Sequence, residues 1–198
     1  MFDKSESQPG GRPAGNREEN GMSRAFGPIF QVAYVVEGVE AHIDHWTRVM
    51  GVGPFFRFPL PLPFAWLEVR GERVPVDAPI YESVAIAYSG ETMIELIQPG
   101  PAPSTYREFL DAGRKGVHHL GTFTDDYDNQ MAAARAAGIG VALEGALPLS
   151  RFAYLDTDIL FPGTMVEIIE PRPSMIELFD GIRAACRDWD GRERIRAM

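Results

Sequence analysis

Two similar series of apolar and polar positions follow one another along the chain. The first opens with the apolar, β-prone run 29–36, and the second opens with the run 117–123. Each run is followed by a stretch with apolar residues at three- and four-residue steps, which predicts a helix, and then by shorter β-prone runs. We therefore expect each half to fold as a strand, a helix and three further strands.

The closing run of each half carries a glutamate among apolar residues. Glu95 lies in the run 92–98 and Glu167 in the run 164–169, within almost the same local sequence. An unpaired carboxylate is costly to bury. Both side chains are therefore expected to have polar or cationic partners.

The remaining elements are predicted from periodicity and capping signals. Ser104 or Thr105 caps a short connecting helix, and the capping box 174–177 opens a carboxy-terminal helix whose apolar face is Ile176, Phe179 and Ile182. The chain beyond Trp189 is expected to fray. The predicted helices are 39–50, 106–112 and 127–137, and the predicted further strands are 83–88, 92–98, 141–143, 151–157 and 164–169.

The stretch 54–74 is rich in aromatic residues and proline. Prolines disfavour a regular strand in its middle. The first half of the chain is longer than the second, and we assign the excess to this stretch. It is expected to be either core with a surface loop or an apolar wall over a ligand pocket.

Composition excludes several classes of protein. The apolar share of 45% suffices for a buried core, and the net charge of −9 disfavours nucleic-acid binding. No apolar run approaches the roughly 20 residues that span a bilayer. The single cysteine, Cys186, excludes an internal disulfide. Without a hydrophobic signal core at its start, the chain is expected to be cytoplasmic and to bind neither nucleic acid nor membranes.

Four motifs occur in a characteristic order: "QVAYVV", "MIELIQP", "GVHHLGTFTDD" and "FPGTMVEIIEP". In this order the chain resembles the vicinal oxygen chelate superfamily, the glyoxalase, bleomycin-resistance protein and ring-cleaving dioxygenase group. The resemblance implies an α+β fold in which two βαβββ modules form a curved mixed sheet around a divalent metal. The resemblance covers a domain at 28–171, with module one at 28–100, a linker helix at 101–115 and module two at 116–171. Residues 1–27 are rich in Gly, Pro, Ser and charged residues and are expected to be a disordered tail. Residues 172–198 are expected to form the carboxy-terminal helix and tail.

The resemblance also implies a set of metal ligands: Gln31, Glu95, His119 and Glu167. His119 rather than His118 aligns with Gln31, because "HLGT" and "QVAY" occupy the same place in the repeat. His118 is then expected to face away as a packed or hydrogen-bonded residue. Two carboxylates, an imidazole and an amide suit one divalent first-row ion per chain, such as zinc, nickel, cobalt or manganese rather than iron.

The family's shared chemistry implies a substrate with vicinal oxygens. A proton is taken next to a metal-chelated carbonyl to give an enediolate-type intermediate, by a lyase or an isomerase. Glu167 or Glu95 would be the base, and family analogy favours Glu167. The quartet resembles glyoxalase I, whereas "YREFLDAGRKGVHHLGTFTDD" resembles methylmalonyl-CoA epimerase. The run 83–86 lacks the second carboxylate of such epimerases, which disfavours a two-base mechanism.

Aromatic side chains are the candidates for the pocket wall, and they suggest an apolar, aromatic substrate. Family resemblance implies a homodimer. Two alternatives stay open: a non-catalytic, antibiotic-type binding protein of the same fold, and a ring-cleaving dioxygenase, which Gln31 in place of a histidine disfavours. The candidate substrate-binding residues are Phe55, Phe56, Trp66, Tyr81, Phe152 and Tyr154.

Overall fold

The two series of strands fold as two similar halves of a mixed sheet. The computed structural model describes residues 26–159 and 164–198. The first half contains β1 (Ile29–Val35), α1 (Val39–Arg48), β2 (Phe55–Arg57), β5 (Tyr81–Ser89) and β6 (Thr92–Pro99). The second half contains β7 (Gly116–Phe123), α3 (Tyr127–Ala136), β8 (Val141–Leu147), β9 (Ser150–Leu155) and β10 (Met165–Pro171). The fold is α+β, as the sequence predicts.

Six further elements join or extend these halves. α2 (Thr105–Asp111) connects them, and the side chain of Ser104 accepts a hydrogen bond from the backbone N–H of Arg107 at its start. This confirms Ser104 as the cap. The other elements are the hairpin β3 (Trp66–Val69) and β4 (Glu72–Arg73), a 3-10 turn at Thr157–Ile159, α4 (Pro173–Arg187) and β11 (Ile195–Ala197).

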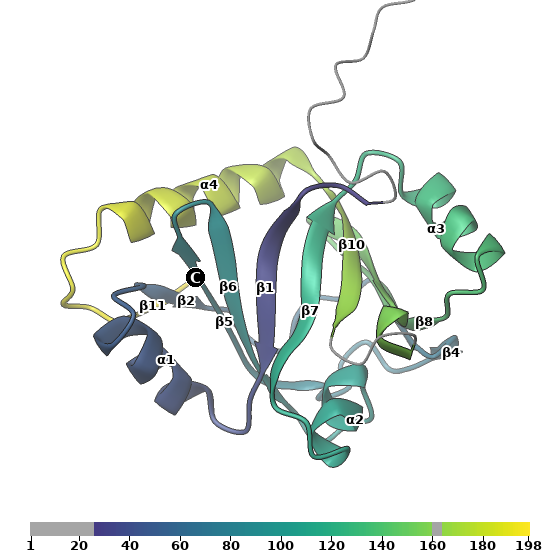
Figure 1. Cartoon of the computed structure of the whole chain (residues 1–198), viewed down its shortest axis with the longest axis horizontal. Helices are drawn as coiled ribbons and strands as arrows, with labels where there is room; N and C mark the ends of the chain where they lie inside the picture. The colour runs from purple at the N-terminus through teal and green to yellow at the C-terminus, as the bar shows by residue number, and fades with distance from the viewer. Residues whose placement is uncertain (1–25, 160–163) are drawn as a thin grey trace, which may run out of the picture.

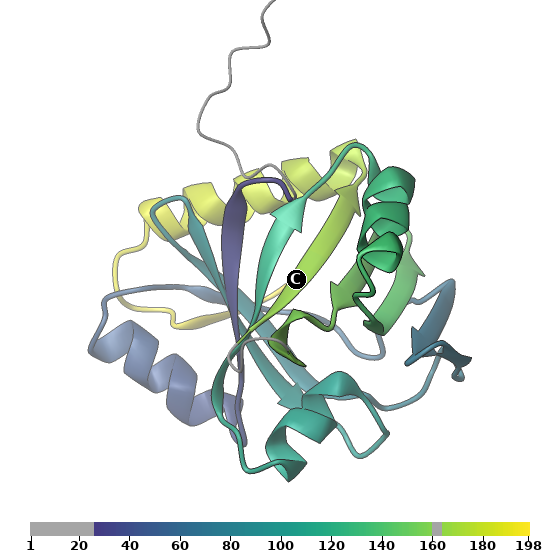
Figure 2. The same cartoon turned by 45° about the vertical axis from the view of Figure 1, so that its right-hand side comes forward.

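Across the described residues, eleven strands form one sheet in the order β11-β2-β5-β6-β1-β7-β10-β9-β8-β3-β4. β1 and β7 pair antiparallel at its centre, and the halves extend from this pair in equivalent order. The sheet curves strongly, as the turned view shows (Figure 2). The hairpin β3–β4 belongs to the first half in sequence but pairs with β8 of the second half.

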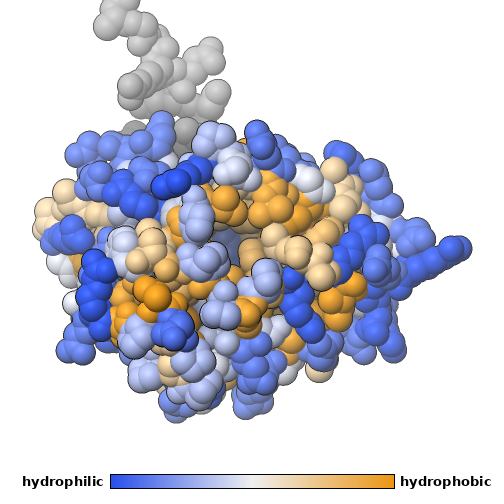
Figure 3. Space-filling model, turned by 180° about the vertical axis from the view of Figure 1, so that it is seen from behind, coloured by the Kyte–Doolittle hydropathy of each residue, from blue (hydrophilic) through white to orange (hydrophobic). Residues whose placement is uncertain are grey.

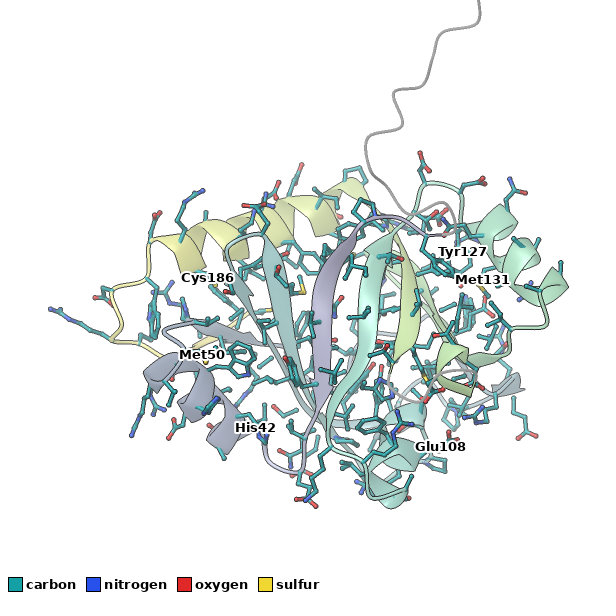
Figure 4. All side chains as sticks on the ribbon, in the orientation of Figure 1. His42, Met50, Glu108, Tyr127, Met131 and Cys186 are labelled. Atoms are coloured by element: carbon teal, nitrogen blue, oxygen red, sulfur yellow. The ribbon has the colours of Figure 1, made fainter. Side chains whose placement is uncertain are left out.

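Helices α1 and α3 flank the sheet on either side of its centre (Figure 1). Because strand residues alternate in direction, Ala85 and Ala87 of β5 pack with Ile43 of α1. Tyr127 and Met131 of α3 pack against β9 and β10 in the same way (Figure 4). We call the face that these two helices cover the outer face, and the opposite one the inner face.

Helix α4 packs on inner-face residues rather than on the outer face. Its buried residues, Phe179 and Ile182, contact Ile86 and Met93. Ile176, predicted to be on the apolar face, is instead 36% exposed. The predicted capping box is also wrong, because the helix begins at Pro173 with Arg172 as its N-cap and without a side-chain cap. Proline suits the first helical turn because it lacks an N–H to satisfy.

The carboxy terminus is more ordered than the sequence indicates. Residues beyond Trp189 were expected to fray, but β11 pairs in parallel with β2. The predicted tail, residues 1–27, lies almost wholly outside the described residues. Within the described part of the chain, none of the helices combines the length and apolar character needed to cross a membrane.

Candidate active site

Four polar side chains from the four central strands meet on the inner face of the sheet. They come from β6, β1, β7 and β10, in that spatial order: Glu95, Gln31, His119 and Glu167. All but Glu95 are buried, and Glu95 is half-buried. The structure therefore brings together the four residues that the family resemblance implies as metal ligands.

The strand registers explain why these four positions coincide. β1 pairs in parallel with β6 so that Gln31 lies two residues before the partner of Glu95. β7 pairs in parallel with β10 so that His119 lies two residues before the partner of Glu167. His119 thus occupies in the second half the place that Gln31 has in the first, as the sequence repeat predicts.

The polar atoms of the quartet contact one another directly. Nε2 of Gln31 donates a hydrogen bond of 2.6 Å to Oε2 of Glu95. Nε2 of His119 lies 3.3 Å from Oε2 of Glu95 and 3.3 Å from Oε2 of Glu167. This nitrogen is buried, and no well-directed hydrogen bond satisfies it. Two carboxylates from different halves of the chain therefore converge on one imidazole nitrogen.

The electrostatics of the quartet demand a cation between the carboxylates. Burial lowers the pKa of His119, but the carboxylates of Glu167 and Glu95 outweigh it and raise that pKa to about 9. Burial raises the pKa of Glu167, against the opposing effect of His119. Here a proton on His119 is the positive charge beside the buried carboxylate of Glu167 and the half-buried carboxylate of Glu95.

A glycine makes room for the amide of Gln31. Gly121 on β7 lies opposite Gln31 in the β1–β7 ladder. A Cβ atom at Gly121 would lie 2.4 Å from Oε1 and 2.9 Å from Cβ of Gln31. These distances are far shorter than van der Waals contact, so the side chain of Gln31 depends on glycine at this position.

His118 lies behind the quartet and contacts it. The register of β7 against β1 shifts between Val117 and His119, so that His118 is the extra residue of a β-bulge. Its Nδ1 lies 3.0 Å from Nδ1 of His119, and its Nε2 lies 3.4 Å from Oγ1 of Thr105. His118 is packed and hydrogen-bonded, as predicted, but the bulge turns it toward His119 rather than fully away.

The contacts of His118 determine which ring nitrogen of neutral His119 carries the proton. The hydroxyl of Thr105 donates to Sδ of Met165 at 3.3 Å, so its oxygen is free to accept from Nε2 of His118. Nδ1 of His118 is then the acceptor, and Nδ1–H of His119 donates to it. The lone pair of neutral His119 is thereby placed on Nε2, between Glu95 and Glu167.

A chain of tyrosines ends at one of the two glutamates. The hydroxyls of Tyr81 and Tyr106 are 2.8 Å apart, the rings of Tyr106 and Tyr154 meet edge-on with centroids 5.7 Å apart, and Tyr154 lies directly across the strand ladder from Glu167. Burial raises the pKa of Tyr154 well above its usual value, so the residue stays a neutral donor.

The two glutamates therefore have different neighbours at equivalent positions. Tyr154 on β9 is the cross-strand partner of Glu167, and Ile86 on β5 is the cross-strand partner of Glu95. Glu167 has a hydroxyl donor beside it, whereas Glu95 has an alkyl side chain. The two halves of the chain are therefore not equivalent at these glutamates, and the two carboxylates can differ in their chemical role.

An apolar cavity of about 250 Å³ opens beside the quartet, and Gln31, Glu95 and Glu167 form its polar edge. The molecule is hollowed near the centre of the side opposite to the view of Figure 1, and hydrophobic side chains border this hollow (Figure 3). A cavity that joins a largely apolar wall to a few convergent polar groups has the character of a small-molecule site.

Three of the six predicted wall residues line this cavity: Tyr81, Phe152 and Tyr154. The other three are placed elsewhere. Phe55 is fully buried with α1 on the outer face. Phe56 lies beneath Arg196 of β11, and Trp66 lies beneath Arg73 of the hairpin. Side-chain direction depends on strand register, which composition does not reveal.

The rest of the cavity wall comes from two segments whose packing in the fold could not be predicted from the sequence. The proline-rich stretch contributes Phe58, Leu62 and Phe64 to the cavity wall. Phe64 is at the same time part of the hydrophobic core, so the stretch combines features of both expected roles. Helix α4 contributes Met175, Leu178 and Phe179. The apolar periodicity of α4 was visible in the sequence, but nothing there indicated that it covers the inner face.

The types of donor atom in the quartet suit a divalent cation. The positions of these atoms, however, are not those of ligands around a metal ion. A buried imidazole Nε2 without a hydrogen bond faces two carboxylates, and an amide lies beside them. Here Gln31 directs its Nε2 rather than its Oε1 toward Glu95. In the described residues, no group of three or more His, Cys, Asp or Glu side chains has the spacing that holds a metal ion.

Comparisons with known proteins agree with the arrangement of strands. A family model described as the glyoxalase/bleomycin resistance protein/dioxygenase superfamily matches residues 30–161. No curated protein sequence matches the chain significantly.

Solved structures of similar fold share little sequence with the chain. A hypothetical protein from Bacillus halodurans aligns with a TM-score of 0.52 at 14% identity, over 73% of this chain and 94% of that one. Methylmalonyl-CoA epimerase from Mycobacterium tuberculosis aligns with a TM-score of 0.51 at 17% identity, over 77% and 93%. A variant of the Streptomyces coelicolor methylmalonyl-CoA epimerase, in complex with 2-nitronate-propionyl-CoA, gives 0.50 at 17%, over 75% and 96%. These likenesses establish the fold.

Proposed function

The chain belongs to the glyoxalase/bleomycin resistance protein/dioxygenase superfamily, and from this premise we propose that it is a divalent-metal-dependent lyase or isomerase. It would remove a proton next to a carbonyl group of a small substrate with vicinal oxygens. One observation carries this proposal: two carboxylates and an unsatisfied imidazole nitrogen converge at the edge of an apolar cavity.

Gln31, Glu95, His119 and Glu167 would hold one divalent ion, such as zinc, nickel, cobalt or manganese. Glu95 and Glu167 balance its charge, His119 offers Nε2, and Gln31 would offer Oε1 after its amide turns over. His118 supports the site by accepting from Nδ1–H of His119, which keeps the lone pair on Nε2. When bound, the metal would act as a Lewis acid that makes the C–H next to a substrate carbonyl more acidic.

Glu167 is the residue that we assign as the base. Its carboxylate borders the cavity and is buried, and burial disfavours its charged form. It therefore accepts a proton more readily than an exposed carboxylate does. Tyr154 lies across the ladder from Glu167, so its hydroxyl is the donor nearest in the sheet to this carboxylate in our proposal. Glu95, which lies beside Ile86 and accepts from Gln31, has no such donor hydroxyl across the ladder.

The cavity supplies the other requirements of proton abstraction. Its walls exclude water from the carbanion-like centre, and they orient the substrate so that the C–H faces Glu167. Return of the proton from Glu167 to the neighbouring carbon would complete an isomerisation. If a group on the neighbouring carbon left with its bond electrons instead, the same proton abstraction would complete an elimination. We further propose that the protein is cytoplasmic and forms a homodimer, as the family resemblance implies.

Replacement of Glu167 by Gln tests the assignment of the base. The measurement is exchange of the substrate C–H for deuterium in D₂O, followed by NMR, for a panel of 2-hydroxyketones, 2-oxoaldehyde adducts and acyl thioesters. We expect E167Q to reduce exchange at least about 10²-fold, because general-base catalysis contributes 10²–10⁴-fold. Glu170 lies on the same strand and pairs with Arg151 on the surface, so E170Q is the matched control and should exchange at the wild-type rate.

Two results would contradict this account. Exchange at the full rate in E167Q, with metal retained, would exclude Glu167 as the base. A wild-type protein that binds members of the panel but exchanges none of them would be a binding protein of the same fold, not an enzyme.

A further inference from the structure

The cavity beside the quartet contains no basic side chain among the described residues that line it. The charged lining groups are the carboxylates of Glu95 and Glu167, and the remaining polar side chains are Gln31, Ser150 and the hydroxyls of Tyr81 and Tyr154. A pocket for a phosphate, a carboxylate or a peptide needs at least one cation or a cluster of N–H donors facing the ligand. This wall offers neither arginine nor lysine.

Basic residues next to the lining residues in sequence are turned away from the cavity. Arg151 lies between two lining residues on β9, yet it pairs with Glu170 at 2.6 Å and Asp128 at 3.0 Å. Its guanidinium also lies over the ring of Tyr127 on the outer face. Arg57, which precedes the lining residue Phe58, pairs with Glu40 of α1. Strand alternation thus places these cations on the outer face.

Away from the quartet, the cavity wall has no positive charge of its own. A divalent ion held by Glu95 and Glu167 would accept substrate oxygens only at the quartet, where two negative charges offset its two positive ones. The chain as a whole has a net charge of −9, so its long-range field also disfavours anions. An anionic substituent within the cavity would lie unpaired among apolar side chains.

The size and cover of the cavity limit what fits. An apolar cavity of roughly 150 Å³ accommodates benzene, so a volume of about 250 Å³ has room for a phenyl-sized group with a short side chain. Met175, Leu178 and Phe179 of α4 form one wall, and Phe58, Leu62 and Phe64 form another. Both walls present apolar surface to the ligand.

We propose that the substrate of this site is an uncharged carbonyl compound with an aromatic or branched aliphatic group, which lies within the cavity and carries no carboxylate or phosphate. The inference that the substrate is a carbonyl compound rests on the proposed function. The inference that it carries an uncharged apolar group rests on the cavity walls alone. An anionic group is excluded from the apolar part of the cavity, because no cationic side chain lines that part.

Binding of two matched probes tests the proposal. They are 1-phenylpropane-1,2-dione, which is uncharged, and phenylglyoxylate, which has a similar ring and carbonyl but carries a carboxylate. Their dissociation constants are measured by titration calorimetry on metal-free and zinc-loaded protein. We expect the dione to bind at least about tenfold more tightly to the metal-free protein, because the carboxylate has no cationic partner in the cavity wall. Chelation of zinc by phenylglyoxylate would narrow this difference in the zinc-loaded protein.

A variant with a cation added to the cavity wall should reverse the preference between the two probes. Leu178 is half-buried on α4 and lines the cavity, so L178R should gain affinity for phenylglyoxylate and lose affinity for the dione. I176R places the same cation at an exposed position of α4 that does not line the cavity, and it should leave both affinities at their wild-type values. Equal or tighter binding of phenylglyoxylate to the metal-free wild-type protein would overturn the proposal, and this result needs no variant to fold.

These outcomes test the proposed substrate class separately from the proposed reaction. Preference for the dione in metal-free protein supports the substrate class even if no C–H exchange is found. Loss of that preference with exchange intact would overturn the substrate class and leave the proposed reaction standing.

Discussion

At the scale of single residues, the site depends on how closely two strands approach. Gln31 on β1 packs against Gly121 on β7, where a Cβ would lie 2.4 Å from the amide oxygen and 2.9 Å from Cβ of Gln31. The glycine is needed here for space rather than for backbone freedom. Of the glycines along this strand, Gly121 is the one that a quartet side chain directly contacts.

Replacing Gly121 with alanine should displace Gln31 and weaken metal binding. The new methyl group cannot coexist with the present position of Gln31, so the amide leaves the quartet. We expect metal affinity in G121A to fall about tenfold or more, as for the loss of a supporting ligand contact. Competition with a chromogenic chelator measures it.

A second glycine provides the control for this substitution. Gly181 lies within α4, and a Cβ there would meet nothing within 4 Å. G181A should leave metal affinity unchanged and stabilise the fold by about 0.5–1 kcal/mol, because alanine is the better helix former. Wild-type affinity in G121A would show that Gln31 is not a ligand.

The sequence predicts the quartet more fully than it predicts the wall of the cavity. Gln31, Glu95, His119 and Glu167 repeat in register between the halves, so one alignment places all four. Phe55 and Phe56 could not be placed in this way, since a shift of one residue reverses every side chain of a strand. The bulge that turns His118 toward His119 also leaves no signal in composition.

At the scale of elements, the hairpin β3–β4 ties the first half of the chain to the second. β3 pairs with β8, and Arg70 at the turn donates to Glu108 of α2 at 2.6 Å and to Asp156 at 2.7 Å. Arg70 adopts a φ of 50°, uncommon for a residue other than glycine. These contacts hold the proline-rich wall of the cavity against the second half.

Removal of the Arg70 side chain should destabilise this connection. Asp156 has a side chain that is 7% exposed, so R70A leaves a nearly buried carboxylate without its partner. We expect the free energy of unfolding to fall by about 1–3 kcal/mol. Urea unfolding followed by circular dichroism gives the value.

Arg73 on the same hairpin is the matched control. It pairs with Glu68 on the surface, and exposed ion pairs contribute at most about 1 kcal/mol. R73A should therefore cost less than R70A. Equal losses in the two variants would mean that the Arg70–Asp156 pair does not hold the hairpin.

Elements that depend on neighbouring residues could be predicted from the sequence, whereas strand pairings between distant segments could not. Helices α1, α2 and α3 were expected within a few residues of their observed bounds, because their periodicity and caps are local. The pairing of β3 with β8 and of β11 with β2 joins distant segments. Prolines and charges had argued against regular structure in both, and tertiary packing overrode those local preferences.

At the scale of the whole molecule, the two halves share one site. β1 and β6 supply Gln31 and Glu95, and β7 and β10 supply His119 and Glu167. The antiparallel pairing of β1 with β7 brings these contributions together within a single chain. Each half alone holds two of the four polar groups, so neither could bind a divalent ion tightly by itself.

This arrangement has a consequence for assembly. Because all four groups come from one chain, metal binding should not depend on the homodimer that we propose. Dilution below the dimer dissociation constant should leave the metal content per chain unchanged, which also makes metal content a clean measure of the site itself.

Metal content of the purified protein, compared with an E95A/H119A double variant, tests the central claim most directly. Both proteins are incubated with excess divalent ions, passed through a desalting column and analysed for elements. Our account predicts one zinc, nickel, cobalt or manganese ion per wild-type chain and none in the variant, because the variant lacks a carboxylate and the imidazole. A wild-type protein that retains no metal, or a variant that retains as much as the wild type, would contradict it.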